Sequence, residues 1–127
     1  MAKILIVDDD PSLQEVLEIA LSNREHTPSS AADIDGALQL MGRKHFDLVI
    51  ADLRLGRESG LDLLQRIRER RHVPPVLMIT AYADKKTALQ ALELGATDYI
   101  SKPFDVDEFL LQAEKILEEE RPREENL

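Results

Sequence analysis

The sequence has no cysteine and no long apolar run, and its basic residues are far outnumbered by acidic ones. Without cysteine, neither a disulfide framework nor a thiolate metal site can form. No stretch approaches the ~20 apolar residues that a membrane-spanning helix needs, so no membrane association is expected. The N-terminus enters an apolar run without a basic, cleavable leader, and the predicted location is therefore cytoplasmic.

The scarcity of basic residues gives the chain a formal net charge of −9 at pH 7. A nucleic-acid surface requires clustered Lys and Arg, so no direct nucleic-acid binding is expected of this chain. A length of 127 residues is that of one ordinary domain with one core. These features favour a small globular protein that acts on, or responds to, something other than DNA.

Short apolar runs that end in polar, Pro or Gly residues predict strands buried on both faces of a sheet. They cover residues 4–7, 48–50 and 76–79, with a weaker run at 99–100. Position in the chain calls for another strand at 26–32, where Pro28 and two serines make a poor one. We therefore predict a short edge strand there.

Between these runs, the spacing of apolar residues predicts helices with one buried face, and a further helix from Asp33 to about Arg43. Asp10-Pro11, the pair Asp105 and Glu108, and Gly95 predict two helix starts and one helix end. The residues expected on the buried faces are Leu13, Val16, Leu17, Ala20, Leu21, Leu61, Leu64, Ile67, Ala88, Ala91, Leu92, Val106, Phe109, Leu110, Ala113, Ile116 and Leu117.

The alternation of strands and helices predicts an α/β fold. We expect a single doubly wound, five-stranded parallel sheet in the flavodoxin-like order 2-1-3-4-5, with five helices on both faces. The domain is expected to span residues 1–119. Residues 120–127 are charged and nearly free of apolar side chains, and we expect a tail or the start of a linker.

Polar residues follow the predicted strands at the edge where parallel strands end: Asp8, Asp9 and Asp10 after the first, Asp52 after the third, Thr80 after the fourth, and Ser101, Lys102 and Pro103 after the fifth. In this strand order the first and third strands are neighbours, so Asp8, Asp9 and Asp52 would face one crevice. Two unit charges about 4 Å apart repel by roughly 4 kcal/mol at an effective dielectric of about 20. We therefore expect a bound cation there.

The donors in this crevice are hard oxygens without a nearby His or Cys, which predicts Mg²⁺, with Mn²⁺ able to substitute. Lys102 would add a cation and Thr80 a hydroxyl. The pocket would then contain what phosphoryl transfer to a carboxylate requires, with Asp52 as the acceptor. Asp10, followed by proline, is expected to start a helix instead.

From Lys3 to about Glu118 the sequence resembles the receiver domain of two-component response regulators. The matching residues are IVDDD, the strand end at Asp52 with Gly60 eight residues later, MITAYA and GATDYISKPF. The segments ITAYAD and GATDYISKPFDVDEF are most similar to receivers of NtrC-like activators. In those proteins a sigma-54-dependent AAA+ ATPase and a helix-turn-helix DNA-binding domain follow the receiver, which implies that such an output domain partners this chain.

The resemblance implies a role for each residue of the acidic crevice. Asp52 would be the phospho-acceptor, and Asp9 would bind Mg²⁺ directly together with Asp52 and the backbone carbonyl of Arg54. Asp8 would act through water. Lys102 would pair with the phosphoryl group or with the Asp52 carboxylate.

The resemblance also implies a switch. The Thr80 hydroxyl would bond a phosphoryl oxygen, and its movement would be coupled to rotation of Tyr99. The face formed by the fourth helix, the fifth sheet strand and the fifth helix would repack, changing a homodimer or the contact with an output domain. The peptide bond before Pro103 is expected to be cis.

The chain departs from many receivers at Gly56, where a proline commonly stands four residues after the acceptor; a more mobile loop is expected there. Arg54 and Tyr82 occupy positions at which the family tunes phosphoryl hydrolysis. We hypothesise that these bulky side chains hinder the attacking water and give a long-lived phospho-form.

His26, His45 and His72 lie in polar stretches and are expected at the surface. None is placed as a phosphohistidine, so the phosphoryl donor would be a separate sensor histidine kinase. The chain itself would be a regulatory phospho-acceptor, not an enzyme, with only self-directed phosphotransfer and autodephosphorylation.

Three alternatives share parts of this pattern. A receiver-like module can signal by protein contact without phosphorylation. An aspartyl-phosphate phosphatase would need a second acid two residues after the acceptor, where this chain has Arg54. A flavodoxin-type cofactor binder would place a flavin phosphate after the first strand, where DDDP would repel it.

Overall fold

A computed structural model describes residues 1–81 and 84–120 of the chain. The central sheet contains β1 (Lys3–Val7), β2 (Thr27–Ala31), β3 (Leu48–Asp52), β6 (Val76–Ala81) and β7 (Asp98–Lys102). All four pairings between them are parallel, and the order is β2-β1-β3-β6-β7. Counting only the strands of this sheet, the order is 2-1-3-4-5, so the predicted doubly wound fold is confirmed.

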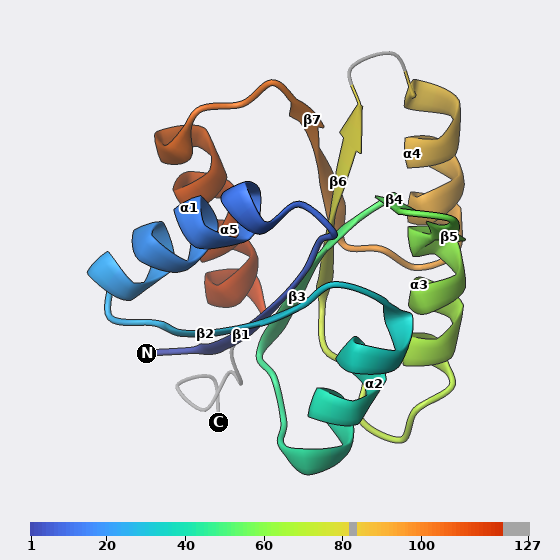
Figure 1. The fold of residues 1–127 in the computed structure, drawn as a ribbon, viewed down its shortest axis with the longest axis horizontal. Coiled ribbons are helices and arrows are strands. Elements are labelled where there is room, and N and C mark those ends of the chain that lie inside the picture. The colour runs from blue at the N-terminus through green and yellow to red at the C-terminus, as the bar shows by residue number, and fades with distance from the viewer. Residues whose placement is uncertain (82–83, 121–127) are drawn as a thin grey trace.

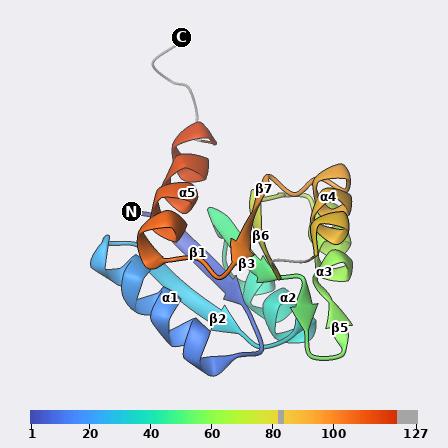
Figure 2. The same ribbon diagram turned by 90° about the horizontal axis from the view of Figure 1, so that it is seen from above.

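In the described residues, five helices cover the sheet in two layers. They are α1 (Pro11–Asn23), α2 (Ile34–Arg43), α3 (Gly60–Arg68), α4 (Lys85–Glu93) and α5 (Val106–Glu119). Helices α1 and α5 lie on one face, and α2, α3 and α4 on the other (Figure 1; Figure 2). No helix in the described part of the chain is long and apolar enough to cross a membrane.

Each strand supplies side chains to both layers because successive residues point to opposite faces. In β1, Ile4 and Ile6 pack in the core beneath α1 and α5, while Leu5 and Val7 belong to the core beneath α2 and α3. All five residues of β3 are buried. This two-sided burial explains the uninterrupted apolar runs in the sequence.

The edge strand β2 is the poor strand that the sequence predicted. Among the strands of the described residues it pairs with β1 alone, from Lys3 opposite Thr27 to Val7 opposite Ala31. Only Ala31 is buried among its residues, and the Ser30 hydroxyl donates to the Glu18 carboxylate of α1. An edge position tolerates Pro28 because one side of the strand needs no ladder partner.

The predicted helix ends are confirmed. The Asp10 carboxylate accepts bonds from the N–H groups of Ser12 and Leu13 at the start of α1. Asp105 and Glu108 form a capping box at the start of α5. Gly95, just beyond α4, has a φ of +107°, in the left-handed region that glycine favours.

Two predictions of burial on helix faces are wrong. Val16 is 46% exposed, because the buried stripe of α1 runs through Leu17, Ala20 and Leu21 and leaves Val16 at its margin. Val106 is 38% exposed, because it is the first residue of α5. Residues 121–127, the greater part of the predicted tail, lie outside the described residues.

The expectation of a surface position fails for His26 and is correct for the other two histidines. The His26 side chain is only 10% exposed. Its Nδ1 accepts the N–H of Ala2, and its Nε2 lies 3.2 Å from a Glu114 oxygen on α5. Pairing of β1 with β2 brings Ala2 to His26, whereas Glu114 comes from α5, and a local reading of the sequence could show neither contact. His45 and His72 are exposed, with ring centroids 4.6 Å apart.

Between β3 and α3 the chain forms a short antiparallel hairpin that the sequence did not predict. Its strands are β4 (Arg54–Leu55) and β5 (Glu58–Ser59). Gly56 occupies the turn with a φ of +63°. Proline, whose φ is fixed near −65°, could not adopt this conformation, which explains the glycine at the position where many receivers carry proline.

Candidate phosphoryl-acceptor site

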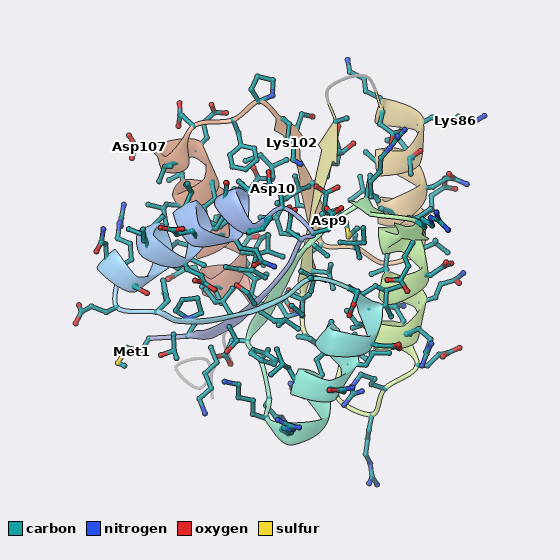
Figure 3. All side chains as sticks on the ribbon, viewed as in Figure 1. Met1, Asp9, Asp10, Lys86, Lys102 and Asp107 are labelled. Carbon is teal, nitrogen blue, oxygen red and sulfur yellow. The ribbon has the colours of Figure 1, made fainter. Side chains whose placement is uncertain are left out.

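Three polar side chains are buried in the described residues, and all three lie where strands of the central sheet end. Asp8 is 1% exposed, Asp52 is 6% exposed and Thr80 is 1% exposed. Figure 3 shows Asp9 and Lys102 at this same edge of the sheet, opposite the end at which Met1 lies. Burial of polar groups is costly, so their concentration at one edge marks a site.

Asp52 is held from two sides. One carboxylate oxygen, Oδ1, accepts the backbone N–H of Arg54 at 2.8 Å. The other, Oδ2, lies 2.7 Å from the ammonium nitrogen of Lys102 at the end of β7. The carboxylate therefore enters the site with a fixed orientation and a paired charge.

Lys102 stays protonated in this setting. Burial alone would lower the pKa of its ammonium group, but the hydrogen bond and the negative charge of Asp52 outweigh that effect and raise the pKa above its usual 10.5. The side chain thus supplies a permanent positive charge beside the Asp52 carboxylate.

Gly60 allows α3 to begin directly against the end of β3. A Cβ atom at this position would lie 2.3 Å from the carbonyl oxygen of Asp52 and 2.9 Å from the Cα of Leu53. The Gly60 N–H also donates to the Leu53 carbonyl at 2.7 Å. The glycine eight residues after the acceptor is therefore required by close backbone packing.

Asp8 is far less well satisfied than Asp52. Its Oδ1 accepts the Asp10 N–H at 2.8 Å, whereas its Oδ2 is buried without a hydrogen-bond partner. Burial, assisted by the negative charges of Asp52 and Asp9, raises the pKa of the Asp8 carboxyl to about 6, against the opposing effects of the Asp10 N–H and Lys102. The pocket therefore penalises the negative charge of Asp8 in the absence of a cation.

Asp9 is exposed and faces the hairpin: its Oδ2 lies 3.8 Å from the point that a Cβ of Gly56 would occupy. Within residues 1–81 and 84–120, no group of three His, Cys, Asp or Glu side chains is arranged to hold a metal ion alone. Mg²⁺, however, keeps several waters and needs only one or two carboxylates from the protein. The orphaned Asp8 Oδ2 and the hard-oxygen donor set fit such a hydrated ion.

Thr80 and Tyr99, the predicted switch residues, make contacts with groups other than Asp52. The Thr80 hydroxyl lies 3.2 Å from the Ala81 carbonyl oxygen and 3.3 Å from that of Asp84, at the approach to α4. The partly buried ring of Tyr99 packs against the core on the α4 face of the sheet. Its backbone carbonyl accepts a bond from Gln112 of α5 at 2.7 Å.

The remaining predictions for the site concern the peptide bond before Pro103 and the side chains of Arg54 and Tyr82. The Lys102–Pro103 peptide bond is cis. Arg54 is exposed on β4, and Tyr82 lies outside the described residues.

Two residues near the site carried no motif in the sequence. The Gln14 amide donates to the carbonyls of Asp8 and Ala31, and the Glu58 carboxylate of β5 accepts the N–H of Ile34 at the start of α2. The contacts of Gln14 with Ala31 and of Glu58 with Ile34 join residues 17 and 24 positions apart in the chain, so only the folded structure reveals them.

The chain belongs to the response regulator receiver domain family, whose model matches residues 4–114. It is the receiver domain of a two-component response regulator, as the resemblance predicted.

Among its relatives is the response regulator protein PilR of Pseudomonas aeruginosa, 47% identical over 104 residues, which cover 82% of this chain and 23% of PilR. The transcriptional regulatory protein DltR of Streptococcus agalactiae is 35% identical over 108 residues, covering 85% of this chain and 48% of DltR. The chain thus spans less than half the length of these relatives.

The solved structure of the receiver domain of NtrX from Brucella abortus superimposes with a TM-score of 0.86 at 37% identity, covering 91% of this chain and 98% of that one. The matches to PilR and NtrX support the predicted similarity to NtrC-like receivers.

Proposed function

We propose that this receiver is a phosphorylation-dependent switch in which Asp52 accepts a phosphoryl group from the phosphohistidine of a sensor kinase. The observation that carries the proposal is the buried Asp52 carboxylate, fixed between the Arg54 N–H and the Lys102 ammonium at the edge where the strands end. In the transfer, an Asp52 oxygen forms a bond to phosphorus while the phosphorus–nitrogen bond of the donor breaks.

The residues around Asp52 divide the remaining work. Asp9, Asp52 and the Arg54 carbonyl would hold Mg²⁺, with Asp8 acting through water; the ion supplies charge neutralisation for the phosphoryl oxygens when bound. Mn²⁺ would substitute. Lys102, already 2.7 Å from Asp52, would shift its ion pair to the phosphoryl group.

The output would arise from Thr80 and Tyr99. To bond a phosphoryl oxygen, the Thr80 hydroxyl must leave the carbonyls of Ala81 and Asp84, which alters the approach to α4. Rotation of Tyr99 would follow and repack the face of α4, β7 and α5. Helix α4 carries Leu89, 55% exposed, and α5 carries Leu111, 74% exposed, and such exposed apolar side chains suit a homodimer or a contact with an output domain.

The output domain we propose is the AAA+ ATPase and DNA-binding pair of NtrC-like regulators, so nucleic acid would be bound outside this chain. The receiver would act in the cytoplasm. Its only chemistry would be phosphotransfer to itself and loss of that phosphate. A phosphatase acting on other substrates is disfavoured because Arg54 cannot protonate a leaving group.

The intact mass of the protein tests the proposal after incubation with Mg²⁺ and a small phosphodonor. We expect one added phosphoryl group, which is lost in Asp52→Asn and when Mg²⁺ is chelated. The exposed Asp107→Asn serves as the matched control and should label like wild type. No added mass would instead support a receiver-like module that signals without phosphorylation. A mass that survives Asp52→Asn would show that another residue is the acceptor and would overturn the role of Asp52.

A further inference from the structure

Gln14 reaches from the first turn of α1 to the ends of two neighbouring strands. Its side-chain amide nitrogen donates to the Asp8 carbonyl at 2.6 Å and to the Ala31 carbonyl at 3.0 Å. A primary amide has two N–H groups, so one side chain can serve both acceptors. Gln14 is partly buried, and both contacts are shielded from full solvent exposure.

The two carbonyls lie where the ladder between β1 and β2 stops. Val7 and Ala31 form the last residue pair of this ladder, and the Asp8 N–H donates to the Ala31 carbonyl at 3.0 Å. The Gln14 amide supplies the donors that another strand residue would have supplied. It therefore continues the hydrogen bonding between β1 and β2 past their last residue pair, as far as Asp8.

With Gln14 in place, Asp8 is fixed at its N–H, at its carbonyl and at Oδ1, and only the buried Oδ2 is left without a partner. The peptide unit that joins Asp8 to Asp9 is planar, so a fixed Asp8 carbonyl also sets the direction in which the chain enters Asp9. The hydrogen bonds of Gln14 thereby orient both Asp8 and Asp9.

A neutral amide suits this position better than a charged side chain would. A Lys or Arg here would offset the negative charge that attracts a cation, and a Glu would place an acceptor against two carbonyl acceptors. Glutamine supplies donors without changing the charge of the pocket.

We propose that Gln14 is a positioning residue for the cation site, holding the Asp8–Asp9 peptide so that Asp9 can bind Mg²⁺ directly, and Asp8 through water, with little reorganisation. The inference rests on the proposed function, because it assumes that the pocket binds Mg²⁺. Residues that orient metal ligands through hydrogen bonds typically contribute tenfold or more to metal affinity.

Gln14→Met tests the inference, since it removes both donors and keeps an unbranched side chain of similar length. By isothermal titration of the metal-free protein, we expect the Kd for Mg²⁺ to rise about tenfold. Hydrogen exchange at the Asp9 and Asp10 amides should become faster. At saturating Mg²⁺, phosphoryl labelling of Asp52 should return to within about twofold of wild type, because Asp52 and Lys102 remain in place.

Gln39→Met on the exposed face of α2 is the matched control and should leave the Kd unchanged. Gln14→Asn, whose amide is one methylene too short to reach both carbonyls, provides a second variant if Gln14→Met fails to fold, and the same loss of affinity is expected.

A lower melting temperature with an unchanged Mg²⁺ Kd in the Gln14 variants would overturn the inference and leave Gln14 as a structural contact only. Failure of the wild type to bind Mg²⁺ would overturn the proposed function and the inference together. Failure of labelling in a wild type that binds Mg²⁺ would overturn the proposed function alone.

Discussion

The ends of β1 and β3 lie side by side in the sheet, and each carries a buried aspartate, yet the two carboxylates are treated differently. Both oxygens of Asp52 have donors, the Arg54 N–H and the Lys102 ammonium. Asp8 has a donor for one oxygen and none for the other. A buried acceptor without a partner costs about 1–3 kcal/mol.

The difference separates two tasks. At the end of β3 the fold completes its own interactions, so the nucleophile is held ready in one orientation. At the end of β1 the fold leaves an interaction open, so the pocket gains most when a cation arrives. Substitutions at the two strand ends test this contrast, and the largest effect is expected at Lys102.

Lys102→Met should remove one of the two donors to Asp52 at the end of β3. Without the ammonium, Asp52 loses its counter-charge, and we expect phosphoryl labelling to slow by about a hundredfold or more at saturating Mg²⁺. The measurement is the rate of mass gain with a small phosphodonor. Lys86→Met on the exposed surface of α4 is the control, with an unchanged rate expected. Similar rates for both variants would contradict a role for Lys102.

Gly60→Ala should disturb the backbone at the end of β3. The new Cβ would meet the Asp52 carbonyl oxygen at 2.3 Å, and we expect a loss of about 2–3 kcal/mol in the free energy of unfolding. Urea unfolding measures the loss. Gly42→Ala in α2, where a Cβ meets nothing within 4 Å, should instead stabilise by up to about 1 kcal/mol. Equal stabilities of the two variants would show that the β3 end tolerates expansion.

Asp8→Asn should remove the buried negative charge at the end of β1 and so stabilise the metal-free protein. The pKa of Asp8 is raised from 3.8 to about 6, so folding is penalised by its charge above pH 6, and the penalty vanishes as pH falls below 3.8. We expect the variant to be more stable than wild type by about 1–3 kcal/mol at pH 7. The difference should shrink toward pH 4.

Urea unfolding between pH 4 and pH 7 checks this prediction. Asp52→Asn, which gives up the bond to Lys102, should show no comparable gain at pH 7. A stability difference for Asp8→Asn that does not change with pH would mean that its charge is not the cause.

Removal of the bulky Arg54 and Tyr82 side chains has the smallest expected effect. If Arg54 and Tyr82 hinder the attacking water, Arg54→Ala with Tyr82→Ala should shorten the lifetime of the aspartyl phosphate several-fold. Loss of phosphoryl mass over time measures that lifetime. Arg57→Ala, exposed on the same hairpin, is the control. A longer lifetime in the double variant would contradict the hypothesis.

The sequence predicts the sheet and the convergence of its strand ends because both depend on local patterns. Apolar runs at 48–50 and 76–79 are buried on both faces, as their composition indicates. Because the alternation of strands and helices implies parallel strands, Asp8, Asp52 and Lys102, which lie at strand ends, must come to one edge of the sheet.

Other features leave no recognisable pattern in the sequence, either because their elements are very short or because they depend on contacts between distant residues. The strands β4 and β5 have two residues each, too few to show periodicity, and the turn at Gly56-Arg57 lacks the usual Asn-Gly signal. His26 is buried because Ala2 and Glu114 approach it, and Gln14 acts on carbonyls 6 and 17 residues away. Such contacts become visible only after folding.

The position of Tyr99 has a practical consequence. The chain has no tryptophan and two tyrosines, so its near-ultraviolet absorption and emission come mainly from Tyr82 and Tyr99. The Tyr99 ring packs on the core beside α4, at the strand through which the proposed switch would act. With Tyr82 replaced by phenylalanine, the remaining tyrosine would serve as a built-in optical reporter, allowing conformational change to be followed without an attached dye.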